Sequence, residues 1–316
     1  MSLFCFPNLI YKEMRTKPLL KWVGGKSQIL EEVLSSFPLE MRNYYEPFVG
    51  GGSVLMGFLE GLQQQKWRLT GKVYVSDANA ALIGFYRNVR DHPEELIAAV
   101  KAVCEPFMKV PVEGGLNRCP ETEEQAKTSR ESYYYWIRQK FNGLTTQERM
   151  SVQGSAYVLV LNKTCFRGVW REGPHGFNVP YGHYRNVVVV DDAHLREVSA
   201  LLQGVEFNTY SFEVPLGKLG RDDFVYLDPP YVPEGATSFV GYTAEKFSLA
   251  KHEDLFRLCA QMQGKGVRFA LSNACVPLVL SAFPSPPFQV QRLTARRAIH
   301  SKNPESITIE VLVKNF

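Results

Sequence analysis

Apolar residues in the first ninety positions recur with helical spacing between short apolar runs. In residues 26–37 the apolar side chains fall at every third or fourth position, which predicts one face of a helix. Residues 44–62, YYEPFVGGGSVLMGFLEGL, predict a strand, a glycine turn and a helix. Residues 72–89 predict a second strand that leads into a helix. Residues 17–90 therefore predict the start of an α/β fold.

The middle of the chain changes to a mainly helical pattern. Residues 91–165 contain several helical stretches, and we expect the segment 112–131, rich in glycine and charge, to form a loop between them. Strand-like runs return at residues 205–210, 224–228, 267–273 and 306–316. The pattern predicts one α/β domain, rich in parallel strands, that is interrupted by a helical and basic insertion.

A further helix is predicted over residues 248–266. Ser248 is expected to cap its amino end, because a serine side chain can accept a hydrogen bond from an amide of the first turn. Gly264 is expected to end the helix, because glycine adopts the left-handed conformation that terminates helices.

Composition limits the classes of protein to consider. With 316 residues, 45% of them hydrophobic, the chain can fill a sizeable core. The six cysteines are scattered without a C-x-x-C pair, which argues against a disulfide framework and against a metal site for zinc. No window of about 18 residues is apolar throughout, and the first residues lack the pattern of a signal peptide. We therefore expect an intracellular protein with no membrane partner and no metal.

Residues 224–233, FVYLDPPYVP, carry the first candidate site. The run from Phe224 to Leu227 has the composition of a buried strand, and two consecutive prolines cannot donate hydrogen bonds to a sheet, so the strand must end there. Asp228 then stands at the carboxyl end of a strand, which is where ligands bind in open α/β sheets. The alternative is that an Asp-Pro-Pro turn followed by a packed tyrosine serves structure alone.

Three further stretches together predict a site for a nucleoside that carries an amino acid. The glycines at 50–52 let the backbone turn tightly and approach a ligand. Asp77, one strand later, is placed like the acid that holds a ribose hydroxyl pair. In KWVGGK, Trp22 offers a flat apolar surface and Lys26 a cation for a carboxylate. Each stretch also has a plain alternative: a packing turn for the glycines, a helix cap or turn residue for Asp77, and a solvated lysine beside a buried tryptophan for KWVGGK.

Five motifs in this order, KWVGGK, EPFVGGGS, SDAN, LDPPY and LSN, resemble those of the Dam family of DNA adenine-N6 methyltransferases, the D12 class in the alpha arrangement. The resemblance covers residues 19–316. It implies a Rossmann-like α/β methyltransferase domain, dependent on S-adenosylmethionine and built on a mostly parallel sheet, with an inserted helical, hairpin-bearing DNA-recognition domain. The implied divisions are an N-terminal extension of residues 1–14, a catalytic domain of residues 15–86 and 186–316, and a target-recognition domain of residues 87–185.

The resemblance implies S-adenosyl-L-methionine as cofactor and double-stranded DNA as partner. The positions that match cofactor-binding residues of the family are Trp22, Lys26, Phe48, Gly50, Asp77, Ser211, Phe212 and Asp228. The positions that match catalytic residues are Asp228, Pro229, Pro230 and Tyr231.

The chemistry of amine methylation explains why such a turn is needed. An exocyclic amine is a poor nucleophile, because its lone pair is delocalised into the ring. The Asp228 carboxylate and the Pro229 carbonyl are expected to accept its two hydrogens and favour a lone pair directed at the methyl donor. Tyr231 is expected to stack on an adenine that has been flipped out of the duplex.

Residues 161–190 carry the case for DNA. Cations and aromatic rings alternate there around glycines, which predicts a β-hairpin that contacts phosphates and inserts a ring into a base step. The alternative is a solvated basic loop over an aromatic core. The positions that match DNA-contacting residues of the family are Lys21, Phe166, Val169, Arg171 and Pro180, and Arg167 is predicted to contact DNA as a cation of the hairpin.

The resemblance implies GATC as the methylated site, with one departure. The family usually has Asn-Gly-Leu where this chain has Arg167-Gly168-Val169, so the phosphate contact or the sequence recognised can differ. A second basic cluster, residues 292–302, is expected between the last two strands, where it could follow the DNA backbone or form only a hairpin tip.

The residues leave several activities open. A cytosine-N4 or an RNA adenine methyltransferase would use the same amine chemistry, and a catalytically silent DNA-binding module would need no intact site. The basic insertion favours DNA, and the intact Asp228 and Tyr231 favour an enzyme. We expect a DNA-associated protein of the cytoplasm, with a cognate restriction endonuclease of a restriction-modification system as a candidate partner.

Overall fold

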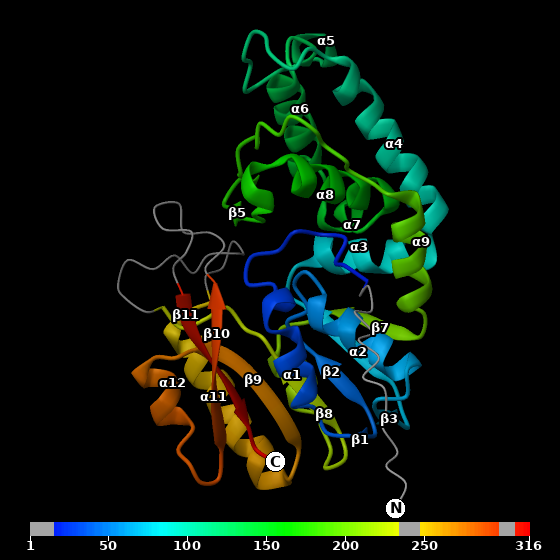
Figure 1. Cartoon of the computed structure of the whole chain (residues 1–316). Coiled ribbons are helices and arrows are strands. Elements are labelled where there is room, and N and C mark those ends of the chain that lie inside the picture. The colour runs from blue at the N-terminus through cyan, green and yellow to red at the C-terminus, as the bar shows by residue number, and fades with distance from the viewer. Residues whose placement is uncertain (1–15, 234–246, 297–306) are drawn as a thin grey trace, which may run out of the picture.

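The computed structural model describes residues 16–233, 247–296 and 307–316 (Figure 1). Within these residues the main sheet has seven strands, in the order β10-β11-β9-β8-β2-β4-β7. The five strands from β9 to β7 run parallel, and β11 is antiparallel to both of its neighbours, so the predicted mostly parallel sheet is confirmed. The strands are β2 (Tyr44–Glu46), β4 (Val73–Asp77), β7 (Val205–Thr209), β8 (Phe224–Leu227), β9 (Arg268–Ala274), β10 (Gln289–Arg296) and β11 (Ile307–Lys314).

Helices cover both faces of this sheet, and the central strands are buried on both sides. In β8 all four side chains are 0% exposed, which explains its unbroken apolar run. Phe224 and Tyr226 pack into one core, whereas Val225 and Leu227 pack into the other. The first core includes side chains of α1 (Leu30–Ser35), α2 (Ser53–Gln63), α3 (Ala80–Asp91) and α9 (Asp192–Leu201). The second includes side chains of α10 (Glu213–Leu216), α11 (Leu249–Lys265) and α12 (Pro277–Ala282).

The order of the strands creates a switch point beside β2. From β2 the chain moves outward through β4 to β7, and it then returns to the other side of β2 to form β8 and β9. In open α/β sheets ligands bind outside the carboxyl ends of the strands at such a point. The ends of β2 and β8 carry the glycine turn and Asp228, so the topology brings two of the predicted motifs together.

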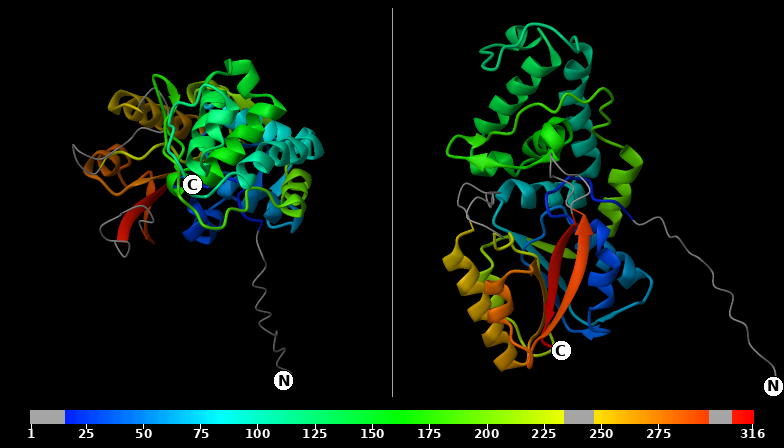
Figure 2. Two further views of the ribbon diagram at one scale, coloured as in Figure 1. Left: turned by 90° about the horizontal axis from the view of Figure 1, so that it is seen from above. Right: turned by 60° about the vertical axis from the view of Figure 1, so that its left-hand side comes forward.

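A separate group of helices lies beyond the carboxyl end of the sheet, as Figure 2 shows from two further directions. It consists of α4 (Pro93–Lys109), α5 (Glu123–Ala126), α6 (Arg130–Asn142), α7 (Thr146–Arg149) and α8 (Val152–Thr164). The small hairpin β5 (Glu172–Gly173) and β6 (Gly176–Phe177) follows them. The helical pattern predicted for this part of the chain is confirmed, and its role in DNA recognition stays a prediction.

Two local predictions are wrong. Helix α11 begins after Ser248, whose side chain accepts from the Lys251 amide as expected, but it continues through Gly264 and ends at Gly266, whose φ is 69°. The segment predicted as a loop contains α5, because the Thr122 side chain caps it and two acidic residues favour its amino end.

The strand β10 was missed altogether. Arg292 was expected between the last two strands, but it lies within β10, where it pairs with Val311 of β11. The remainder of the second basic cluster, residues 297–302, lies outside the described residues, as does the N-terminal extension of residues 1–14. In the described part of the chain, no helix has the length and apolar character needed to cross a membrane. Short strands β1 (Glu40–Met41) and β3 (Arg68–Leu69) pair separately.

Candidate active site

A cavity of about 1490 Å³ opens between the carboxyl end of the sheet and the helical group. Its wall brings together every residue that was predicted for the cofactor or for catalysis, although these positions are spread over more than two hundred residues of sequence. The predicted residues that line it are Trp22, Lys26, Phe48, Gly50, Asp77, Ser211, Phe212, Asp228, Pro229, Pro230 and Tyr231.

The glycine turn after β2 needs glycine for both backbone and steric reasons. Gly50 and Gly52 have φ angles of 48° and 76°, which residues other than glycine rarely adopt. A Cβ on Gly50 would lie 2.9 Å from the Trp22 ring, and one on Gly52 would lie 2.7 Å from the Tyr86 hydroxyl. Tyr86 donates to the Gly50 carbonyl at 2.9 Å. The turn is therefore held closely against Trp22 and opens into the cavity.

Asp77 ends β4 on the far side of this turn. Its carboxylate accepts from the amides of Asn79 at 2.9 Å and Gly50 at 3.3 Å. The cap of α3 is Asn79, which accepts from the Leu82 amide, so Asp77 is not the helix cap, but its bond to the Asn79 amide fits the alternative of a turn residue. Burial raises the pKa of Asp77 to about 6, although the two amide hydrogen bonds lower the pKa and so limit the rise.

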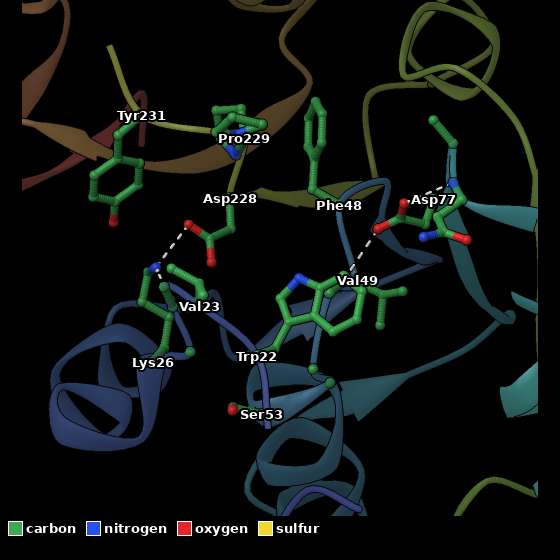
Figure 3. A pocket seen from close by; sticks show the side chains of 18 of the residues that line it. Trp22, Val23, Lys26, Phe48, Val49, Ser53, Asp77, Asp228, Pro229 and Tyr231 are labelled. Carbon is green, nitrogen blue, oxygen red and sulfur yellow. Dashed lines mark hydrogen bonds and ion pairs between the residues drawn. The ribbon is translucent and has the colours of Figure 1, made fainter. Parts of the chain in front are cut away.

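Three phenylalanine rings form one wall of the cavity. The ring centroids of Phe48 and Phe212 are 5.5 Å apart, and Phe247 lies 5.9 Å from Phe48 and 5.6 Å from Phe212. Figure 3 shows Phe48 and Trp22 between the carboxylates of Asp77 and Asp228. The cavity thus has an apolar middle and a carboxylate at each side.

Asp228 follows β8 at the other side of the cavity and pairs with Lys26. The Lys26 Nζ lies 2.8 Å from Oδ1 of Asp228, with the two side chains 4% and 20% exposed (Figure 3). Lys26 also donates to the Gly24 carbonyl at 2.6 Å. Burial raises the pKa of Asp228 to about 6, and the nearby ammonium limits this rise.

The rest of the D-P-P-Y turn is fixed from three separate elements. The Tyr231 hydroxyl donates to Oε2 of Glu310 at 2.7 Å, and the Val232 amide donates to Oδ1 of Asn273 at 3.0 Å. The Nε2 atom of His252, a fully buried side chain, lies 2.9 Å from the Pro230 carbonyl oxygen. Asn273 was predicted only as part of the LSN motif, and Glu310 and His252 were missed because no sequence motif marks them.

A further buried carboxyl group lines the cavity. Glu46 is 2% exposed and accepts from the Tyr44 hydroxyl at 2.7 Å. Burial raises its pKa to about 8, and the negative charge of Asp228 contributes to this rise. Glu46 begins the EPFVGGGS motif, but no pattern in that motif indicates that its side chain turns inward.

Comparison with known proteins decides the family. The family model of D12 class N6 adenine-specific DNA methyltransferases matches residues 22–299. The chain belongs to this family. It is accordingly an enzyme whose family transfers methyl groups to adenine N6 in DNA.

Individual relatives match over nearly the whole chain. The Type II methyltransferase M.MjaIII of Methanocaldococcus jannaschii is 32% identical over 96% of this chain and 100% of its own length. The Type II methyltransferase M1.LlaDCHI of Lactococcus lactis subsp. cremoris is 31% identical, over 98% and 99%. The DNA adenine methylase of Haemophilus influenzae is 27% identical, over 96% and 95%.

The residues predicted to contact DNA lie in two places on this methyltransferase. Lys21, Arg167 and Val169 line the mouth of the cavity. Phe166 is 48% exposed beside them, and its amide donates to the Pro180 carbonyl at 2.8 Å. Arg171 lies on the hairpin side, where its Nε donates to Oδ1 of Asn178 at 2.6 Å. Their contact with DNA stays a prediction.

The aromatic residues of this region divide into two groups. The predicted hairpin is present as β5 and β6, and Trp170, Phe177 and Tyr181 are buried, so these three rings form an aromatic core as the alternative interpretation expected. Trp170 stacks on Trp22 with ring centroids 6.3 Å apart, which joins the region to the glycine turn after β2. Phe166 is exposed, and Tyr184 is half-buried with the Lys21 Nζ 4.7 Å from its ring centroid.

Arg167 has an unusual backbone conformation. Its φ is 56°, in the left-handed region, and Gly168 follows with a φ of 64°. Asparagine tolerates this region better than arginine does, so Arg167 is held there with some strain. A Cβ on Gly168 would lie 2.5 Å from the Lys21 Cβ, which shows how closely the two segments pack.

Among the residues that the structure describes, no group of three or more His, Cys, Asp or Glu side chains is arranged to hold a metal ion.

Proposed function

We propose that the protein is a site-specific DNA methyltransferase that moves a methyl group from S-adenosyl-L-methionine to N6 of an adenine flipped out of duplex GATC. The observation that carries this proposal is the placement of Asp228. Its carboxylate stands beside a proline-fixed carbonyl and a partly exposed tyrosine, at the sheet's switch point and on the wall of a large cavity.

The groups around the cavity fit the proposed cofactor part by part. Asp77 offers carboxylate oxygens for a ribose hydroxyl pair. The rings of Phe48 and Phe212 offer apolar faces for an adenine, next to Ser211. The glycine turn leaves room for close approach, since side chains there would collide with Trp22 and Tyr86. When bound, S-adenosylmethionine supplies an electrophilic methyl group on sulfur.

The residues of the turn then activate the amine. Lys26 contacts Oδ1 of Asp228, and we assign Oδ2 and the Pro229 carbonyl as acceptors for the two amine hydrogens. Lys26 keeps Asp228 ionised at neutral pH, because a cation at this distance lowers a carboxyl pKa. The proton of the methylated amine can pass to water, so no strong base is needed. Tyr231 offers its ring for stacking of the flipped base.

The hairpin side of the cavity supports DNA as the polymer. Phe166 is an exposed ring next to Arg167, whose guanidinium lies 5.3 Å from the ring centroid. An apolar wedge beside a cation suits insertion between base pairs with a phosphate contact. GATC rests on the family resemblance of Arg171 and its neighbours. Within the cell we propose that the enzyme acts on cytoplasmic DNA, with a restriction endonuclease of the same site as partner.

Labelled methyl transfer tests the whole proposal. The protein is incubated with methyl-labelled cofactor and three substrates: a duplex with one GATC, the same duplex with the site scrambled, and an RNA duplex of the first sequence. We expect label in N6-methyladenine from the GATC duplex alone. Label in N4-methylcytosine or in RNA would contradict the assignment. Equal labelling of adenine in the scrambled duplex would remove GATC and leave adenine-N6 methylation.

A further inference from the structure

Glu310 brings a second carboxylate to the D-P-P-Y turn from the last strand of the chain. It lies on β11, where its register partners are Ala274 of β9 and Leu293 of β10. Thr308 and Glu310 line the cavity on the face of β11 that continues inward to the buried Leu312. The strand therefore places a charged side chain between two apolar register partners.

The contact made by Glu310 fixes the ring of Tyr231. The Tyr231 hydroxyl donates to the carboxylate at 2.7 Å, and the backbone of the tyrosine is held at its other end by the proline turn and by the Val232 to Asn273 hydrogen bond. A tyrosine ring held at both ends cannot rotate freely about its side-chain torsions. The Lys26 Nζ lies 4.8 Å from the centroid of the same ring. The ring thus has one defined plane beside Asp228.

We propose that Glu310 is a positioning residue of the methyl-transfer site, whose carboxylate holds the Tyr231 ring in the plane on which the target adenine stacks. The inference rests on the proposed function and deepens it. Because the contact acts through the hydroxyl, the tyrosine is more than an aromatic face, and phenylalanine at this position should not replace it fully.

The same carboxylate faces the catalytic aspartate. Lys26 and Glu310 are the charged side chains that act on the pKa of Asp228, and Asp228 in turn raises the pKa of Glu46, Tyr226 and Tyr231. Of these, Glu310 contributes to the raised pKa of Asp228 through its negative charge. A change at Glu310 should therefore move the pH profile of the reaction. A role of Glu310 only in the packing of β10 against β11 would leave the pH profile unchanged.

Four variants separate positioning from simple stability. Glu310→Ala and Tyr231→Phe each remove one side of the hydrogen bond, and their combination removes both. We expect each single change to slow single-turnover methylation by about tenfold, as loss of a charge-assisted hydrogen bond predicts, and the combination to be no slower. Multiplied losses would overturn the proposal. Glu310→Gln keeps an acceptor, so it should recover most of the rate and move the acid limb of the pH profile to lower pH.

A direct measurement of the ring keeps the inference independent of activity. Fluorotyrosine is placed at position 231 and followed by fluorine NMR in the wild-type protein and in the Glu310→Gln and Glu310→Ala variants. We expect one sharp resonance that shifts and broadens only with Glu310→Ala. Glu206→Ala is the matched control, because it removes a strand carboxylate that pairs with the exposed Lys72 away from the cavity. An unchanged resonance in Glu310→Ala would overturn the proposal. A wild-type protein that methylates no DNA would instead contradict the proposed function.

Discussion

The buried ion pair between Lys26 and Asp228 gives the sharpest prediction. Lys26→Met removes the cation but keeps an unbranched side chain of similar length, so packing around Tyr231 changes little. Because Lys26 is 4% exposed and lies 2.8 Å from Asp228, water cannot replace it as a partner readily. The carboxyl group should then hold its proton to a higher pH.

The size of this effect follows from the pair's geometry. Asp228 has a pKa of about 6 with the cation in place. An opposite charge at this distance lowers a carboxyl pKa by about 1 to 3, so Lys26→Met should move the pKa of Asp228 to between about 7 and about 9. At pH 7 the ionised fraction would fall from about nine-tenths to about one-tenth for a shift of about 2. The rate at pH 7 should fall about tenfold and recover as pH rises.

The assay is single-turnover methylation at saturating cofactor, measured from pH 5 to pH 10. Saturation keeps any loss of cofactor affinity out of the rate. Wild-type protein should lose activity below a midpoint near pH 6, and Lys26→Met should show the same limb at higher pH. Lys26→Arg keeps the charge and is the matched control. Identical midpoints for wild type and Lys26→Met would refute the reasoning, because Asp228 would then not titrate under the control of Lys26.

Three further positions give predictions that follow from the structure. Asp77→Ala should weaken S-adenosylmethionine binding in calorimetry without loss of fold; unchanged affinity would remove Asp77 from the site. Glu46 has a folded-state pKa of about 8 against an ordinary value of 4.5. The free energy of unfolding should therefore fall by about 1.4 kcal/mol per pH unit as pH rises between these two values. Glu46→Gln should flatten this dependence in thermal melts. Arg167→Asn should relieve a left-handed arginine and raise the melting temperature by about 2 °C, whereas a lower temperature would show that the arginine is not strained. Arg167→Ala should make the salt dependence of DNA affinity shallower by about one contact, and an unchanged slope would exclude a phosphate contact.

The parts of the site that could be predicted are set by local chemistry. In FVYLDPP, four apolar residues predict a buried strand, and the two prolines after Asp228 end it. The structure buries all four apolar side chains and leaves Asp228 at the edge of the sheet. The glycine turn after β2 was predictable for the same reason, since its positive φ angles require glycine. Motif order then supplied what spacing alone left open, namely that these turns face one cavity.

The parts that could not be predicted depend on tertiary contacts. Glu310 reaches Tyr231 across 79 positions of sequence, and His252 reaches Pro230 from a neighbouring helix. Neither residue follows a periodic pattern that marks it. Strand β10 was missed because it lies at the sheet edge and carries exposed polar residues at its start, which weakens the alternation. The stacking of Trp170 on Trp22 could not be predicted either, because it joins segments about 150 positions apart in sequence.

The role of the Asp228 carboxylate in methyl transfer is tested by single-turnover methylation of a GATC duplex with the Asp228→Ala variant. A parallel fluorescence experiment uses 2-aminopurine at the target position to report base flipping. The variant lacks the carboxylate acceptor but keeps the proline turn and Tyr231. We expect base flipping to survive in Asp228→Ala while the rate of methyl transfer falls by about 10² to 10³ or more. Asp254→Ala, which removes an exposed carboxylate paired with Arg257, is the control and should leave both unchanged. A near-normal rate in Asp228→Ala would show that the D-P-P-Y turn serves structure alone and would contradict the catalytic role proposed for Asp228.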